Sequence, residues 1–274
     1  LLQCISGYEP RDSTSLNQEV PDYQSALQSR DLRGMKIGIL REALDVDGVD
    51  EAVRKAVLAS IEVFRDAGAE IIDISLPHSK YWVPTYYVIA PSEASSNLSR
   101  YDGAHYGHRA TQLAPEKAES LGPLVATYCQ SRAEGFGAEV KRRIMVGTYA
   151  LSEGYADQYY NQALKARRLI KGDYDAAFSQ VDLLLGPVSP TPAFPLGEKV
   201  DDPLQMYLCD LFTVGANLAG IPAISLPAGK DASGLPLAIQ LQAPALAETR
   251  LLFAGAAYQA MTDFHKLRPD TFES

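Results

Sequence analysis

The sequence predicts an α/β fold in which helices flank a mixed β-sheet core. Two short apolar strands, residues 36–40 and 70–74, enclose an amphipathic helix, and this pattern is typical of a β-α-β unit. Farther along the chain, apolar strands alternate with long helical segments. The last two strands lie close enough in sequence to pair directly, which predicts a mixed sheet.

The helix of the β-α-β unit is predicted from about Asp50, and Gly68 ends it. Its apolar side chains recur at helical spacing and form one face: Val53, Val57, Ile61 and Phe64. The turn after the first strand holds no G-x-G-x-x-G motif, so the sequence gives no support for a dinucleotide site.

The middle of the chain is predicted to be mainly helical. Residues 82–109 are rich in Tyr, Ser and His, and residues 116–128 form a helix or a loop with a helical turn. A long helical region covers residues 138–180, with Gly147 and Gly154 as candidate breaks.

The C-terminal third is predicted to hold three strands and two helices. The strands cover residues 181–185, 224–226 and 237–241, and the helices cover residues 203–217 and 248–264. Pro203 suits the first position of its helix, and a turn around Gly234 separates the last two strands.

Composition excludes several classes of protein. The chain has 274 residues, 46% of them hydrophobic and 22% charged, and a net charge of −9. No apolar run approaches the roughly 18 residues of a membrane helix. The acidic balance argues against broad contact with a nucleic-acid backbone unless a partner supplies the positive charge. Three scattered cysteines form neither a disulfide framework nor a zinc pattern, which favours a reducing compartment, and no signal peptide is visible.

Isolated histidines and cysteines do not form a convincing reactive site. His105 and His108 could share a helical face as metal ligands, but no third ligand has readable spacing, so no metal is expected. Cys129 has no activating base nearby and is expected to be a small buried hydrophobe. Packing is also expected for Cys209. His78 and His265 are expected on the surface or at element ends.

Charged residues in two helical segments are stronger candidates for a binding site. Arg142 and Arg143 point about 100° apart on a helix. If one of them faces inward, it needs a carboxylate from the protein or from a ligand; the alternative is a solvated charged face. Asp210 lies in a predicted helix that is otherwise apolar. It is an N-cap, a member of a structural ion pair, or the acceptor for a ligand ammonium.

A proline-rich loop follows the strand predicted at residues 181–185. Residues 187–192 either line a ligand cleft at the carboxyl end of that strand or form a rigid turn. The chain contains no Gly-Gly pair and no G-x-S-x-G nucleophile elbow. No Ser/His/Asp or Ser/Lys site can be assembled from the residues present.

Five segments resemble the amidase signature family. They are residues 7–15, 92–103, 135–145, 201–207 and 217–223. The Ser-Glu-Ala-Ser-Ser-Asn-Leu stretch at 92–98 and the Glu-Val-Lys-Arg-Arg-Ile stretch at 139–144 resemble one branch, the A subunits of the glutamyl-tRNA(Gln)/aspartyl-tRNA(Asn) amidotransferases. The resemblance covers the whole chain and corresponds to the C-terminal half, or a little more, of a family member.

The resemblance implies the amidase signature fold and an incomplete catalytic apparatus. The family's catalytic Lys, cis-Ser and nucleophilic Ser would lie upstream of residue 1. We therefore expect residues 1–274 to be the C-terminal part of a single amidase domain, without its N-terminal catalytic segment and inactive alone. The apolar start Leu1–Ile5, followed by Gly7, is typical of the last turn of a helix and fits this expectation.

The same resemblance implies a substrate and partners. In the family a Tyr, an Arg and an Asp bind free glutamine, and these match Tyr86, Arg143 and Asp210, with Tyr87 as an alternative to Tyr86. The complete protein would hydrolyse glutamine and pass ammonia to a B subunit, which uses ATP and Mg to activate misacylated tRNA; with a small C subunit they would form a heterotrimer. The glutamine-hydrolysing protein itself would need no cofactor and bind tRNA only through its larger partner.

Some alternatives stay open at this point. A cytoplasmic location is expected, with mitochondria or plastids as alternatives, and the sequence does not separate Glu-tRNA(Gln) from Asp-tRNA(Asn) as the tRNA substrate. Rival functions are an amidase signature hydrolase of small amides and a non-catalytic product of a split gene.

Overall fold

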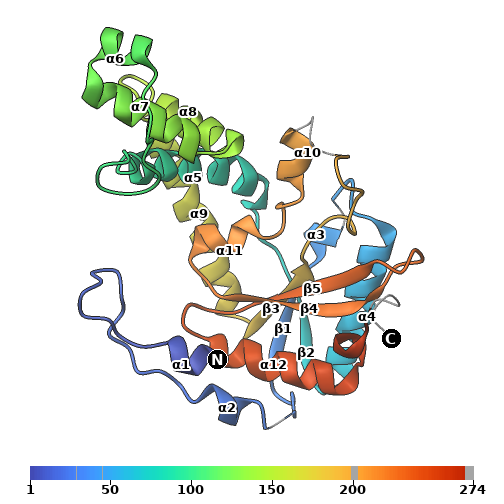
Figure 1. The fold of residues 1–274 in the computed structure, drawn as a ribbon. Helices are drawn as coiled ribbons and strands as arrows, with labels where there is room; N and C mark the ends of the chain where they lie inside the picture. Colours follow the sequence, from blue (N-terminus) through green and yellow to red (C-terminus); the bar gives the residue numbers. More distant parts are fainter. Residues whose placement is uncertain (29, 45, 199–202, 269–274) are drawn as a thin grey trace. The chain divides into compact units, whose positions relative to one another are not determined.

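The computed structural model describes residues 1–28, 30–44, 46–198 and 203–268, and the chain divides into two compact units (Figure 1). The first, called the sheet unit here, comprises Leu1–Val83 and Leu169–Ser274. The second, called the helical unit, comprises Pro84–Arg168.

A five-stranded mixed sheet forms the centre of the sheet unit (Figure 1). Its strands are β1 (Lys36–Leu40), β2 (Glu70–Ile74), β3 (Leu183–Pro187), β4 (Ala223–Lys230) and β5 (Pro236–Gln242). They lie in the order β2-β1-β3-β5-β4. β1 pairs in parallel with β2 and β3, whereas β5 is antiparallel to both β3 and β4. The predictions of a mixed sheet and of direct pairing between the last two strands are confirmed.

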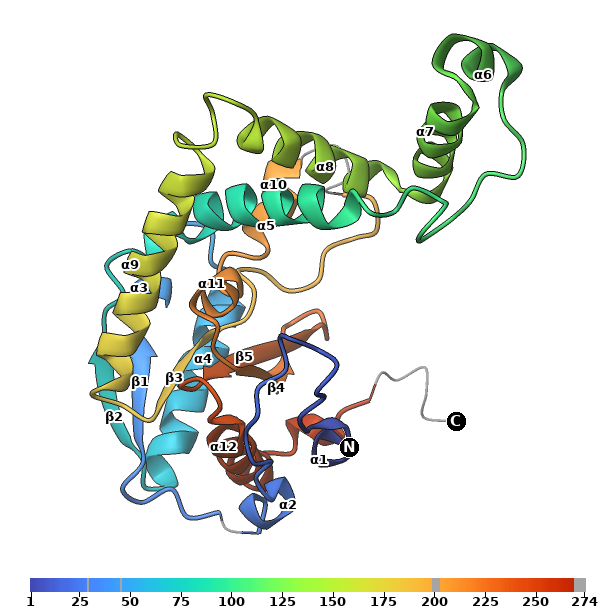
Figure 2. The same cartoon turned by 90° about the vertical axis from the view of Figure 1, so that its left-hand side faces the viewer.

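Two helices, α4 (Glu51–Asp66) and α12 (Glu248–Met261), contribute to the main core of the sheet unit (Figure 2). The predicted apolar face of α4 is buried in this core. Asp50 caps the helix by accepting a hydrogen bond from the backbone N–H of Ala52 at 2.7 Å. Tyr258 of α12 stacks on Phe64 of α4 at 5.2 Å. The β-α-β prediction therefore holds in both its strands and its helix.

Smaller elements complete the sheet unit. They are α1 (Leu2–Ile5), α2 (Tyr23–Ala26), α3 (Arg41–Leu44), α10 (Pro203–Leu208), α11 (Val214–Ala219) and the 3-10 turns η1 (Ser79–Tyr81) and η2 (Phe264–Lys266).

The helical unit contains more separate helices than the sequence predicts. They are α5 (Trp82–Leu98), α6 (Pro115–Leu121), α7 (Pro123–Gly135), α8 (Ala138–Leu151) and α9 (Tyr160–Phe178), of which α5 begins and α9 ends in the sheet unit. The single segment expected at 116–128 is two helices, because Gly122 at φ +80° interrupts them. Gly154, at φ +81°, lies in the break between α8 and α9, as predicted.

Gly147 does not break α8, although the sequence offered it, with Gly154, as a candidate helix break. A Cβ at this position would lie 2.0 Å from the carbonyl oxygen of Pro91 and 2.8 Å from Cβ of Ser95, both on α5. The glycine therefore permits close packing of two helices rather than ending one.

The strand predicted at residues 181–185 begins later in the structure, and the helix predicted at residues 203–217 is divided in two. β3 begins at Leu183 rather than at residue 181, because Asp182 is used at the strand's entrance: its carboxylate accepts the backbone N–H of Lys36 at 2.9 Å. The helix predicted over 203–217 is interrupted by a turn at residues 209–213, between α10 and α11. The placement of Asp210 on a continuous apolar helix was therefore wrong.

Candidate functional site

Two adjacent tyrosines of α5 meet one arginine of α8 in the helical unit. The rings of Tyr86 and Tyr87 contact each other edge to face, with centroids 5.1 Å apart and an interplanar angle of 87°. The guanidinium carbon of Arg143 lies 5.9 Å from the centroid of the Tyr87 ring, within the range of a cation–π contact. Both tyrosines therefore contact Arg143: Tyr87 through its ring, and Tyr86 through a hydrogen bond.

A glutamate on the same helix orients the guanidinium. Arg143 Nε donates to Glu139 Oε1 at 2.9 Å, one helical turn away. Burial lowers the pKa of Arg143, but the hydrogen bonds to Glu139 and then to Tyr86 outweigh it and raise the pKa above its ordinary value. The group is therefore a fixed positive charge. A guanidinium has five N–H donors, more than these two contacts engage, so a ligand carboxylate can still bind to it.

The neighbouring arginine provides an internal comparison. Arg142 is 51% exposed and also pairs with Glu139, whereas Arg143 is 32% exposed and contacts the α5 tyrosines. The structure thus turns only one of the two arginines inward, as the 100° separation on a helix requires. The carboxylate that an inward arginine needs is supplied here by Glu139 of the same chain.

Asp210 belongs to the sheet unit, in the turn at residues 209–213. Its side chain is exposed, and its backbone carbonyl accepts the N–H and the hydroxyl of Thr213, both at 3.0 Å. The structure brings Tyr86, Tyr87 and Arg143 together. The participation of Asp210 with them in binding one ligand stays a prediction, since it lies in the other unit.

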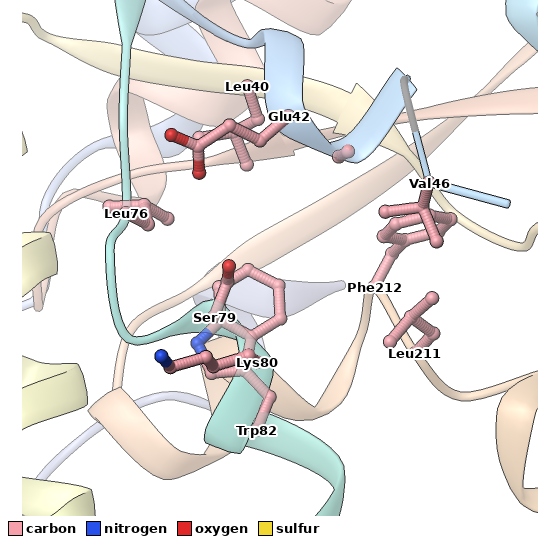
Figure 3. A pocket seen from close by; sticks show the side chains of 10 residues that line it. Leu40, Glu42, Val46, Leu76, Ser79, Lys80, Trp82, Leu211 and Phe212 are labelled. Atoms are coloured by element: carbon pink, nitrogen blue, oxygen red, sulfur yellow. The ribbon is translucent and has the colours of Figure 1, made fainter.

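A cavity of about 310 Å³ lies in the sheet unit next to this turn (Figure 3). Leu211 and Phe212, which directly follow Asp210, form part of its wall. In Figure 3 their side chains lie with Val46 on one side, and Glu42, Ser79 and Lys80 lie on the other. The remaining lining residues are Leu40, Ala43, Leu76 and Trp82. The mostly apolar walls can accommodate an apolar group but offer few polar partners.

The loop at residues 187–192 is both anchored and next to open space. The backbone N–H of Asp50 donates to the carbonyl of Pro190 at 2.8 Å, and Ser189 Oγ donates to the carbonyl of Thr191 at 3.0 Å. Two cavities of about 340 and 240 Å³ are lined in part by Val188. The rigid-turn and ligand-cleft interpretations of this loop are therefore compatible.

The remaining candidates have structural partners or lie on the surface. His105 pairs with Asp102 at 2.7 Å, and His108 pairs separately with Glu134 at 2.8 Å. Among the described residues no group of three or more possible ligands could hold a metal ion. Likewise, no helix in the described part of the chain has the length and apolar character needed to cross a membrane.

The expectation that Cys129 is buried was wrong. Its side chain is exposed on α7, a helix that buries only Ala126 and Ser131. Cys209 is half-buried, which fits the packing role expected of it.

Comparison with known proteins decides the family. Residues 1–252 match the protein family described as Amidase. The chain belongs to the amidase family. It is 68% identical over 271 residues to the A subunit of glutamyl-tRNA(Gln) amidotransferase from Rhodopirellula baltica, covering 99% of this chain and 54% of that protein. It is 53% identical to the protein of the same name from Carboxydothermus hydrogenoformans, covering 98% of this chain and 53% of the relative.

Solved structures agree with the fold. The crystal structure of the A subunit of glutamyl-tRNA(Gln) amidotransferase from Thermotoga maritima matches with a TM-score of 0.67 and 36% identity, covering 91% of this chain and 47% of that one. The peptide amidase of Stenotrophomonas maltophilia, at 24% identity and a TM-score of 0.66, shares the fold. The predicted family and amidase signature fold are confirmed, and the chain spans about half the length of the curated relatives that it matches.

Proposed function

We propose that this chain is the glutamine-recognition part of a glutaminase, the A subunit of a tRNA-dependent amidotransferase that converts Glu-tRNA(Gln) to Gln-tRNA(Gln). The two relatives described above, both A subunits of glutamyl-tRNA(Gln) amidotransferase, support this assignment through their identity of 68% and 53%. The single structural observation that carries it is the inward guanidinium of Arg143, which contacts both Tyr86 and Tyr87 and is oriented by Glu139.

Free glutamine carries an α-carboxylate and an α-ammonium besides its side-chain amide. A site that prefers it to an uncharged amide must neutralise both charges. The planar fork of Arg143 suits the carboxylate, with two parallel hydrogen bonds. Asp210, whose carboxylate is exposed, suits the ammonium, and the Tyr86 hydroxyl adds a polar group beside Arg143.

These residues position the substrate and perform no bond-making step. In the family mechanism a serine attacks the side-chain amide carbon, ammonia leaves, and water releases glutamate from the acyl-enzyme. The resemblance assigns that serine and its partners to no residue of this chain. The B subunit would receive the ammonia and use ATP and Mg, and the C subunit would complete the complex.

Substrates that lack one charge test the two binding roles separately. The test protein has the relatives' full length, contains this chain and is assembled with the B and C subunits; it is called the full-length protein below. Glutaramic acid is glutamine without the α-ammonium, and 4-aminobutanamide is glutamine without the α-carboxylate. Removing a hydrogen-bonded charge partner costs about 2–5 kcal/mol when the pair is desolvated.

Arg143 is about one-third exposed, so the lower part of that range applies. We expect Arg143→Ala to reduce kcat/KM for glutamine by about 30- to 150-fold, at 1.36 kcal/mol per tenfold change. Glutaramic acid should suffer similarly and 4-aminobutanamide should not. Asp210→Ala should give the opposite pattern. Arg142→Ala is the matched control, because Arg142 shares the helix and the Glu139 partner but stays exposed.

Equal losses on all three substrates would show that Arg143 and Asp210 are structural and would refute the proposal. A large effect of Arg142→Ala with none from Arg143→Ala would refute the assignment of the inward arginine. The alternative function, hydrolysis of small amides without tRNA partners, predicts that the B and C subunits leave glutamine hydrolysis unchanged.

A further inference from the structure

A buried amide on β5 holds the turn that carries Asp210. Gln240 is 6% exposed. Its Nε2 donates to the carbonyl of Phe212 at 3.0 Å and to the carbonyl of Pro187 at 3.3 Å. One side chain thus ties the end of β3 to the turn at residues 209–213.

The alternation of β5 explains how a glutamine reaches these carbonyls. Leu237, Ile239 and Leu241 point into the core that includes α4 and α12. Successive side chains of a strand point to opposite faces, so Gln240 and Gln242 lie on the other face. The sequence therefore places two buried glutamines side by side on one face of one strand.

The bond to Phe212 matters because the turn is short. The carbonyls of Asp210 and Phe212 are two residues apart, and the Asp210 carbonyl accepts the backbone N–H groups of both Thr213 and Val214, at 3.0 and 3.2 Å. Release of Phe212 would leave its carbonyl without the Gln240 partner and would free the turn to shift. A buried acceptor that loses its hydrogen-bond partner is destabilised, and this favours such a shift.

We propose that Gln240 is a positioning residue for Asp210, fixing the turn at residues 209–213 so that the Asp210 carboxylate meets the α-ammonium of glutamine. This inference rests on the proposed function. Gln240 touches no substrate atom in this scheme; it acts through the backbone of the turn.

Gln242 offers a matched control on the same strand. Gln242 is 2% exposed, has the same side chain as Gln240, and lies on the same face of β5. Burial raises the pKa of the Tyr174 phenol above its ordinary range, and the nearby Gln242 side chain opposes that rise. Gln242 thus lies near Tyr174 of α9, whereas Gln240 makes its hydrogen bonds to the end of β3 and to the turn.

The experiment compares Gln240→Met with Gln242→Met in the full-length protein. Methionine has a similar volume and flexibility but no N–H donor. We expect Gln240→Met to raise KM for glutamine and for 4-aminobutanamide by about tenfold, the equivalent of one 1.36 kcal/mol step, without changing kcat. KM for glutaramic acid, which lacks the ammonium, should stay the same. Gln242→Met should leave all three KM values unchanged.

Hydrogen exchange provides the second measurement. Gln240→Met should speed exchange of the Thr213 and Val214 amides, and Gln242→Met should not. The inference is overturned if Gln240→Met matches Gln242→Met in either measurement while Asp210→Ala still shows its ammonium-specific loss. If Asp210→Ala lacks that loss, the proposed role of Asp210 fails first, and the inference fails with it.

Discussion

Replacing Gly147 with alanine tests whether close packing of α5 on α8 maintains the Tyr86–Arg143 arrangement. The added Cβ would lie 2.0 Å from the Pro91 carbonyl oxygen, whereas real Cβ contacts essentially never fall below 3.0 Å. The two helices must therefore separate by about 1 Å, because a backbone atom cannot rotate away. α5 carries Tyr86 and α8 carries Arg143, so the separation opens the contact between them.

The free-energy cost follows from two opposing effects. Overpacking costs about 1–3 kcal/mol. Alanine gains about 0.5–1 kcal/mol over glycine within a helix. Since the obstructing atom belongs to the backbone, the upper part of the overpacking range applies, and we expect a net destabilisation of about 1–2 kcal/mol.

Gly172→Ala is the control. Gly172 lies in the interior of α9, and a Cβ there meets nothing within 4 Å. This variant should be stabilised by about 0.5–1 kcal/mol through helix propensity alone. Urea denaturation of the full-length protein and hydrogen exchange of α5 and α8 measure the difference, and KM for glutamine should rise only in Gly147→Ala. Equal stability of the two variants, with unchanged exchange in α5 and α8, would refute the reasoning.

Two further predictions concern ionisation in the helical unit. The backbone N–H of His105 donates a hydrogen bond to Asp102, and the His105 ring makes a second, weaker contribution. Together they hold the pKa of the Asp102 carboxyl well below its usual range. The resulting stability is therefore present above the unfolded pKa of about 3.9 and is lost as pH falls from there through the lower folded pKa. Hydrogen-exchange protection factors of residues 101–110, which correct for the intrinsic pH dependence of exchange, should fall over this interval, and in Asp102→Asn they should not. A hydrogen bond with Tyr155 is the main cause that raises the pKa of Tyr149 to about 12; Tyr155→Phe should return the Tyr149 pKa towards 10 in a phenolate absorbance titration, and an unchanged titration would contradict this cause.

Local patterns of the sequence were sufficient for much of the sheet unit. The β-α-β unit could be predicted because its signals lie within about 40 residues: two apolar runs, one apolar face at helical spacing, and a glycine at the helix end. The mixed character of the sheet followed from the short connection between β4 and β5. In these cases the stabilising contacts are near in sequence or are fixed by periodicity.

Contacts between helices were less visible. Gly147 carries the same sequence signal as a helix break, but its role depends on Pro91, which is 56 positions away in the chain. The 100° separation of adjacent residues on a helix shows that Arg142 and Arg143 point in different directions. It could not show which tyrosines the inward one would meet, because this depends on how α5 packs against α8.

The turn at residues 209–213 shows why an apolar run need not remain helical. Residues 206–212 include one charged residue, and their periodicity favours continuation of the helix that Pro203 begins. A helix through this segment would direct the Phe212 carbonyl to an N–H four residues later. Instead that carbonyl accepts the amide of Gln240, 28 residues downstream, and the Asp210 carbonyl accepts Thr213 and Val214 at the start of a new helix. The interruption places Asp210 in a turn with an exposed side chain, where a carboxylate can meet a ligand. The residue that stabilises this interruption, Gln240, lies on strand β5, outside the segment whose pattern predicts the helix.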